Sequence, residues 1–266
     1  KFCLSTLIKT CNILGLEQGK NEGVERWTKI LQLMRPYLIN KDGAIKEWAW
    51  PGLKDNYNHR HSSHLLPVWP YREITPEKTP GLYKAALATL KKKDAFNYEN
   101  AGHGILHSAL IAANLEDAGA VYKKLLRLSG EGFYFNSLAS SHYVNHGIFC
   151  TDVCNTVPAI FMEMLVGSDS GTLELLPALP DYLDSGSIAG VKARNRITVQ
   201  QLNWNMQAHE VNCVLVSDIN QTIDLVFRKG IKNIVSDTKL SSSPLKNMGR
   251  KISLTQGKET HIKISF

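Results

Sequence analysis

Three histidines and one arginine within six residues are the part of this sequence whose residue types point most directly to chemistry. They are His59, Arg60, His61 and His64, and an apolar stretch, residues 65–70, follows them. Imidazole and guanidinium groups are costly to bury and add little to a plain surface. The cluster therefore predicts a site that holds a polar ligand or a metal. The alternative is a polar loop whose imidazoles satisfy neighbouring backbone groups.

A metal is the first candidate ligand for this cluster. His59 and His61 could share one face of an extended segment, and His64 could supply a third ligand, as a zinc site requires. However, none of the five cysteines forms a metal-binding Cys-x-x-Cys, and there is no His-Glu-x-x-His. Arg60 would repel a cation, whereas it suits hydrogen bonding to hydroxyls or carboxylates. We therefore expect no tightly bound metal and no cofactor.

Two acidic residues could take part in the same chemistry. Glu47 precedes the cluster and could orient the histidines or a substrate; its alternative role is a structural salt bridge to Arg60. Asp152 lies between Cys150 and Cys154 where a helix is predicted to begin. A carboxylate at that position stays ionised, as the partner of a catalytic base should. The alternative for Asp152 alone is a helix N-cap.

The elements that must position these residues are helices joined by long loops. A connection over residues 38–78 holds Glu47 and the histidines, and an irregular stretch covers residues 129–150. Loops of this length in compact domains are usually functional. Apolar residues at helical spacing predict six helices: 2–16, 24–34, 80–92, 102–114, 115–128 and 152–165, with a break at 18–21.

The pattern changes near Gly171, after which period-two stretches alternate with turn residues and predict an all-β module. The sequence thus predicts an α+β protein: part of an (α/α)6 barrel or toroid of about six helices, followed by a sandwich-like β domain. The predicted domains are residues 1–170 and 171–266. A tetratricopeptide-like helical array is the alternative for the first part, but no fixed repeat period is visible.

Composition limits the partners. The 266 residues carry a net charge of +7 with the basic residues spread out. The run Lys91–Lys93 is predicted to be a solvated helix end, since no aromatic residues interleave with it as in nucleic-acid sites. No apolar run approaches membrane-spanning length, so we expect neither nucleic acid nor a membrane as partner. Cys3 and Cys11 are predicted core thiols on an apolar helix face. The chain starts at Lys1, so we expect the native protein to extend upstream.

Read in order, several segments resemble glycoside hydrolase family 95, the α-L-fucosidase and α-L-galactosidase family. One matches a Gly-x-Ile-x-Glu-Trp motif, one matches His-Arg-His-x-Ser-His-Leu closely, and the others follow in the family's order up to about residue 204. The segments are residues 42–48, 59–65, 74–80, 163–165, 175–180 and 186–194.

The resemblance implies an inverting hydrolase of α-L-fucosides or α-L-galactosides in complex glycans, of which this chain is the C-terminal part. It implies Asp152 as a catalytic residue that polarises water-activating asparagines, and Arg60 and His61 as sugar ligands, with His59, His64 and Glu47 beside them. The expected partners are an oligosaccharide and the missing N-terminal half of the barrel. The family also suggests a periplasmic or extracellular location.

The sequence departs from the family's pattern around Asp152. Cys150, Val153 and Cys154 replace the Gln, Gly and Asn of the family's motif, and no Ser-Pro-Glu supplies the family's general acid. Two interpretations follow. The first is a hydrolase fragment that is inactive alone. The second is a non-catalytic carbohydrate-binding or structural relative with a degenerate site.

Overall fold

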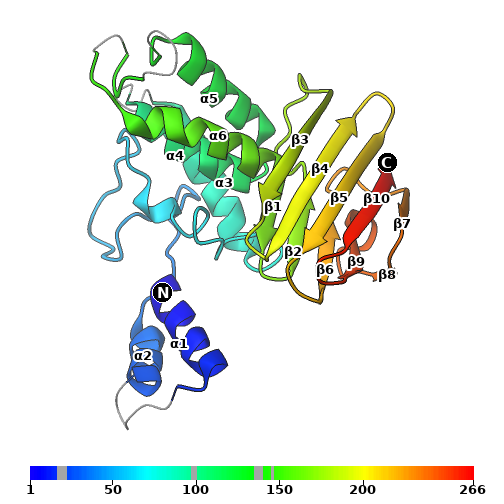
Figure 1. The fold of residues 1–266 in the computed structure, drawn as a ribbon. Coiled ribbons are helices and arrows are strands. Elements are labelled where there is room, and N and C mark those ends of the chain that lie inside the picture. The colour runs from blue at the N-terminus through cyan, green and yellow to red at the C-terminus, as the bar shows by residue number, and fades with distance from the viewer. Residues whose placement is uncertain (17–22, 97–100, 135–139, 145–146) are drawn as a thin grey trace. The chain divides into compact units, whose positions relative to one another are not determined.

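The computed structural model describes residues 1–16, 23–96, 101–134, 140–144 and 147–266. The chain forms two compact units, Lys1–Tyr98 and Glu99–Phe266, and each is described by itself (Figure 1). The predicted break at residues 18–21 lies outside the described residues, as does part of the predicted irregular stretch.

The first unit contains three α-helices and a long connection. They are α1 (Phe2–Leu14), α2 (Gly23–Leu33) and α3 (Pro80–Asp94), all close to their predicted positions. Pro80 occupies the first turn of α3, where its fixed φ suits a helix and its missing N–H is no loss. The prediction for Cys3 is wrong, because Cys3 is exposed while Cys11 is buried. Within α1, the buried residue is Cys11.

The connection between α2 and α3 has its own internal order. Ile39 and Ile45 form an antiparallel bridge, and Gly43 makes the turn between them with a φ of 86°. That left-handed backbone suits glycine, which has no Cβ. The Ile45 N–H donates to Oγ1 of Thr89 on α3 over 2.8 Å. This bond fixes the position of the residues that follow, Lys46 and Glu47. Further along, Ser63–Leu65 form a single 3-10 turn, η1.

The second unit opens with three helices, α4 (Gly102–Asn114), α5 (Ala118–Gly130) and α6 (Thr151–Leu165). His103 contacts Asp152 at one end of α4 and α6, and Asn114 contacts Glu163 at the other. The helices α4 and α6 therefore run parallel and side by side. Helix α5 lies between them in the sequence and runs in the opposite direction. Parallel neighbours joined by an antiparallel helix are the repeating arrangement of an α/α barrel.

Helix α5 begins three residues later than predicted. Glu116 takes a left-handed φ of 58°, which breaks the helical path after α4. Asp117 then caps the new helix by accepting a hydrogen bond from the N–H of Ala120 over 2.9 Å. The apolar residue Leu115, which carried the predicted periodicity, is instead the C-cap of α4. Periodicity alone did not reveal this turn.

Two five-stranded sheets follow and form a sandwich-like domain (Figure 1). One sheet has the order β1-β2-β6-β9-β8 and the other β3-β4-β5-β10-β7. Neighbouring strands are antiparallel except β2 and β6. The strands are β1 (Val166–Asp169), β2 (Thr172–Leu175), β3 (Ser185–Lys192), β4 (Ile197–Asn205), β5 (Glu210–Ser217), β6 (Gln221–Val226), β7 (Asn233–Ser236), β8 (Leu240–Ser242), β9 (Gly249–Leu254) and β10 (Glu259–Ser265). The alternating burial of β5 and β10 matches the period-two sequence pattern.

Six α-helices among the described residues, followed by two sheets, confirm the predicted fold class. Helix α6 passes into strand β1 without a linker, from Leu165 to Val166. The backbone N–H groups of Leu176 and Ala178 donate to carbonyls of Leu165 and Met164 at the end of α6. The predicted domain boundary at residues 170 and 171 falls between β1 and β2 and stays a prediction.

Candidate functional site

A lysine side chain, that of Lys93, forms hydrogen bonds to the backbone of the loop that carries the histidine cluster. The His61 N–H donates to Nδ1 of His59 over 3.3 Å, and the two rings lie 5.2 Å apart. Nζ of Lys93 donates to the backbone carbonyls of His59 and His61 over 2.7 and 3.1 Å. These bonds grip the backbone on both sides of Arg60, which is half-buried. The loop therefore presents Arg60 and His61 from a fixed backbone.

Lys93 corrects the prediction of a solvated helix end. It is only 1% exposed, whereas Lys91 on the same helix is exposed. Burial lowers the pKa of Lys93, while the nearby Glu47 and Asp94 carboxylates oppose that shift. The two carbonyl acceptors offset part of the cost of desolvating the ammonium group. Lys93 thus belongs to the candidate site.

The imidazole ring of His64 is buried, and its nitrogens make no hydrogen bond to the described residues. The residue is 9% exposed. Burial lowers its pKa to about 4, with the charge of Lys93 adding to the shift and Asp55 opposing it. The ring is therefore neutral at pH 7 and offers one donor and one acceptor.

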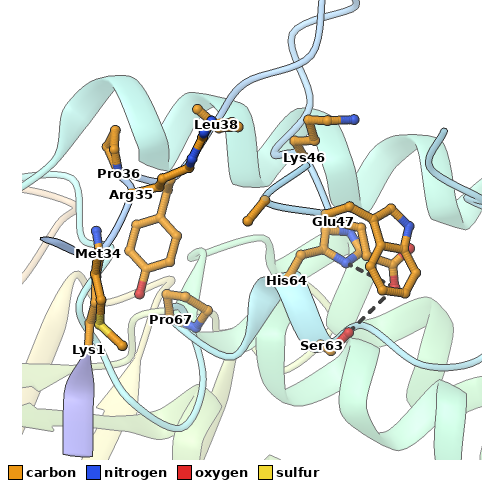
Figure 2. Close-up of a pocket in the computed structure, with 13 residues that line it drawn as sticks. Lys1, Met34, Arg35, Pro36, Leu38, Lys46, Glu47, Ser63, His64 and Pro67 are labelled. Carbon is orange, nitrogen blue, oxygen red and sulfur yellow. Dashed lines mark hydrogen bonds and ion pairs between the residues drawn. The ribbon is translucent and has the colours of Figure 1, made fainter. Parts of the chain in front are cut away.

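Glu47 lies beside this imidazole. Its Oε1 is 4.0 Å from Nδ1 of His64, too far for a hydrogen bond, and 3.4 Å from Oγ of Ser63 (Figure 2). The backbone N–H of Glu47 donates to Oδ2 of Asp55 over 3.0 Å. Asp55 also accepts from the side-chain amide of Asn40 over 2.6 Å. The backbone of Glu47 is thus fixed by Asp55, and the Glu47 carboxylate lies next to Ser63 and His64.

Glu47 and His64 line a pocket of about 440 Å³ within the first unit (Figure 2). That volume lies in the range of small-ligand sites. Lys46, Trp48 and Ser63 also line it. The segment after α2 supplies further wall residues, mostly apolar or aromatic: Met34, Pro36, Tyr37 and Leu38. Convergent polar groups beside apolar walls suit a ligand that has both hydroxyls and C–H faces.

Asp152 lies in the second unit, at the ends of α4 and α6 where both helices begin. It is the second residue of α6, after Cys150 at the N-cap position, so the alternative N-cap role does not apply. Its Oδ2 is 3.2 Å from Nδ1 of His103, and the His107 ring lies 4.8 Å from that of His103. The side chain is exposed.

The structure brings some of the predicted site residues together and leaves others untested. His59 and His61 are neighbours, and Glu47 and His64 share a pocket. Asp152 belongs to the other unit, so its convergence with Arg60 and His61 within about 10 Å, on the scale of paired glycosidase carboxylates, stays a prediction. Sequence reasoning missed Lys93, although it follows Ala86, Thr89 and Leu90 on the buried face of α3.

Two classes of partner can be checked against the described residues. No group of three or more His, Cys, Asp or Glu side chains within them is arranged to hold a metal ion. The expectation that no metal binds stays a prediction. In the same part of the chain, none of the helices combines the length and apolar character needed to span a bilayer.

Comparison with known proteins adds independent information about this arrangement. The model of the glycosyl hydrolase family 95 catalytic domain matches residues 2–165. The model of the glycoside hydrolase family 95 C-terminal domain matches residues 167–262. The two matches meet where α6 passes into β1.

A curated relative and a solved structure illustrate what the chain is similar to. Alpha-L-fucosidase 2 of Arabidopsis thaliana is 34% identical over 200 residues, which cover 73% of this chain and 23% of that protein. The chain therefore spans less than a quarter of that relative's length. A family 127 β-L-arabinofuranosidase from Geobacillus stearothermophilus T6 matches 99% of this chain and 53% of its own, with 12% identity and a TM-score of 0.32. The two family matches together extend through both the helices and the sheets, and they establish that this chain belongs to glycoside hydrolase family 95.

Proposed function

We propose that this chain is part of an inverting glycoside hydrolase that acts on α-L-fucosides or α-L-galactosides of complex glycans. Family membership and the similarity to an Arabidopsis α-L-fucosidase support the hydrolase class and the sugar. Because the chain spans 23% of that relative, the remaining catalytic groups are proposed to lie in sequence that this chain does not contain. An oligosaccharide and that other part of the enzyme are its proposed partners.

The observation that carries the proposal is the unsatisfied, neutral His64 beside Glu47. Buried polar atoms without partners are rare in folded proteins, and a catalytic role or a bound water is among the explanations for them. A pyranose offers several hydroxyls that can exchange a hydrogen bond with an imidazole in the wall of its pocket. The carboxylate of Glu47 would accept a hydrogen bond from a further hydroxyl.

Arg60 and His61 are proposed to bind the sugar from the neighbouring loop, with His59 supporting the backbone of His61. Their guanidinium and imidazole groups suit hydroxyl acceptors and donors. The Lys93 bonds to the flanking carbonyls restrict the movement of this loop. Positioning of this kind matters because small displacements of binding groups reduce rates strongly.

Asp152 is proposed to act on the opposite side of the reaction, by polarising the groups that activate water. Its contact with His103 holds one carboxylate oxygen toward α4. Inverting glycosidases leave space for a water molecule between their two catalytic sides, and an open, exposed Asp152 is compatible with that space.

A non-catalytic carbohydrate-binding relative is the second candidate. The replacements at Cys150, Val153 and Cys154 favour it, because they change the immediate surroundings of Asp152. Both candidates require sugar binding, and they differ in whether the longer protein hydrolyses its ligand. Loss of turnover in Asp152→Asn of the longer protein, with sugar binding retained, would favour the hydrolase.

Sugar binding by the chain itself tests the shared part of the proposal. We expect L-fucose, titrated by calorimetry, to bind the wild-type chain and to bind His61→Ala at least about fivefold more weakly, the cost of about one lost hydrogen bond. His261→Ala is the matched control, since His261 is an exposed histidine on β10. Equal affinity of wild type and His61→Ala, or no binding of L-fucose or L-galactose, would contradict the proposed site.

A further inference from the structure

Two exposed tryptophans lie in one short loop at the edge of the pocket. Trp48 lines the pocket and is 46% exposed, and Trp50 is 65% exposed. Tryptophan is highly buried on average, so two such rings within three residues are unusual on a surface. Exposed apolar groups beside a polar site often mark a binding surface.

The loop that carries these rings is tied at its base. Nζ of Lys46 donates to the carbonyl of Leu53 over 2.6 Å and lies 3.7 Å from Oδ1 of Asp55. The Glu47 N–H donates to the other oxygen of Asp55 over 3.0 Å. These contacts join the two ends of the segment 46–55. Because the base of this loop is fixed, the two rings are already positioned, and less conformational entropy is lost when a ligand binds.

The orientation of the Trp50 ring depends on Gly52, two residues further along the chain. A Cβ on Gly52 would lie 3.1 Å from Nε1 and 3.4 Å from Cδ1 of Trp50. The indole therefore packs directly against the Gly52 backbone. The N–H of Leu53 donates to the Trp50 carbonyl over 3.2 Å and closes a tight turn around it. The ring is a positioned surface of the loop and has little room to turn toward Gly52.

We propose that Trp50, together with the exposed part of the Trp48 ring, forms a second sugar subsite. This subsite would hold the sugar unit that is linked to the sugar in the pocket. This inference rests on the proposed function. The pocket volume of about 440 Å³ suits one sugar ring. Trp50 follows Trp48 by two residues, which span at most about 7 Å of chain. The next sugar of an oligosaccharide would therefore meet the Trp50 ring outside the pocket.

The chemistry of the ring selects the ligand. An indole gives a large apolar face at low conformational cost and keeps a polar N–H at its edge. A pyranose has the matching character, with a face of C–H groups and hydroxyls around its rim. Stacking buries the C–H face of the sugar against the indole and leaves its hydroxyls in water. The subsite would raise affinity for oligosaccharides over the free monosaccharide.

The test compares L-fucose with a trisaccharide that carries a terminal α-L-fucose, each titrated against the 266-residue chain. We expect the trisaccharide to bind about fivefold more tightly than L-fucose, as one added ring contact allows. Trp50→Ala should remove this gain and leave the affinity for L-fucose unchanged. Gly52→Ala should reduce the gain in part, because the new Cβ displaces the ring while the indole remains.

Tyr182→Ala is the matched control, since Tyr182 is a 78% exposed aromatic residue in the second unit. It should change neither affinity. If L-fucose binds but the trisaccharide gains nothing, or if Trp50→Ala keeps the gain, the subsite is refuted and the proposed function stands. If neither sugar binds, both are overturned. If Trp50→Ala keeps the gain and reduces self-association, the rings form a protein interface and the subsite is again refuted.

Discussion

His64 connects the binding proposal with the stability of the fold. A neutral imidazole in a buried position must take up a proton at low pH, either by entering an unfavourable charged state or by unfolding. Its folded pKa of about 4 lies below the ordinary value of 6.5, because of burial and the nearby Lys93. The unfolded chain therefore binds more protons than the folded chain between these values.

We predict that the free energy of unfolding falls as the pH decreases from 6.5 to 4. The contribution of His64 is fully present above 6.5, is lost progressively below it, and amounts to about 3 kcal/mol at most. Urea denaturation at a series of pH values measures the slope. His64→Leu removes the titrating group, so the variant should show a shallower slope over this window. Parallel slopes for the two proteins would contradict the neutral, buried state of His64.

At the scale of elements, the Lys93 side chain links α3 to the histidine loop. We predict that Lys93→Met lowers the free energy of unfolding by about 1–3 kcal/mol, because two carbonyls in a buried setting lose their donor. It should also weaken L-fucose binding, since the backbone around Arg60 is no longer fixed. Denaturation and calorimetry measure the two effects.

Lys91→Met is the control for this change, because Lys91 is exposed on the same helix. It removes the same charge and should alter neither stability nor binding beyond about 0.5 kcal/mol. If Lys93→Met loses stability but binds L-fucose as the wild type does, Lys93 supports the fold and has no role in positioning the loop.

The close approach of α4 and α6 depends on Gly102. A Cβ there would lie 2.7 Å from Cγ2 of Val153 and 3.4 Å from the His142 carbonyl. We predict that Gly102→Ala destabilises the protein by about 1–3 kcal/mol, even though alanine favours helices. Gly81→Ala is the matched control in α3, where a Cβ meets nothing within 4 Å. That change should be neutral or stabilising by up to about 1 kcal/mol, and equal effects at both positions would contradict the packing.

The sequence predicted the elements better than their contacts. Periodicity placed the helices and β strands, and the long polar connection located Glu47 and the histidines. It could not show that Glu116 would turn left-handed, since that depends on how α4 ends. The partnership of His103 with Asp152 joins residues on two helices, which no local pattern encodes. Helical spacing places Lys93 on the buried face of α3, but a charged side chain is expected to face solvent, so the sequence did not reveal its role.

For the whole molecule, we predict no detectable hydrolysis of α-L-fucosides or α-L-galactosides by residues 1–266 alone. General acid catalysis typically contributes about 10²–10⁴-fold, and the Ser-Pro-Glu motif that supplies the acid in the family does not occur here. Release of fucose from a chromogenic α-L-fucoside measures this. Turnover by a monomeric sample, abolished by Asp152→Ala, would show that an acid within this chain serves the reaction.

The same chain should self-associate in solution. Several large apolar residues on and next to α1 and α2 are exposed, including Ile13, Leu14 and Leu33. Apolar surface of this kind favours association with another copy or with a partner. Sedimentation velocity over a range of concentrations measures the assembly state. Joining the chain to the proposed remainder of the hydrolase should reduce the association, and a monomer at all concentrations would contradict the prediction.

The passage of α6 into β1 without a linker limits how such proteins can evolve and be engineered. One residue inserted at Leu165–Val166 would rotate the helix by about 100° against the sheet, turning Asp152 away from His103. The carbonyls at the end of α6 also depend on N–H groups of the β domain. Exchange of the β domain between relatives should therefore preserve the length of this junction, while loops elsewhere vary.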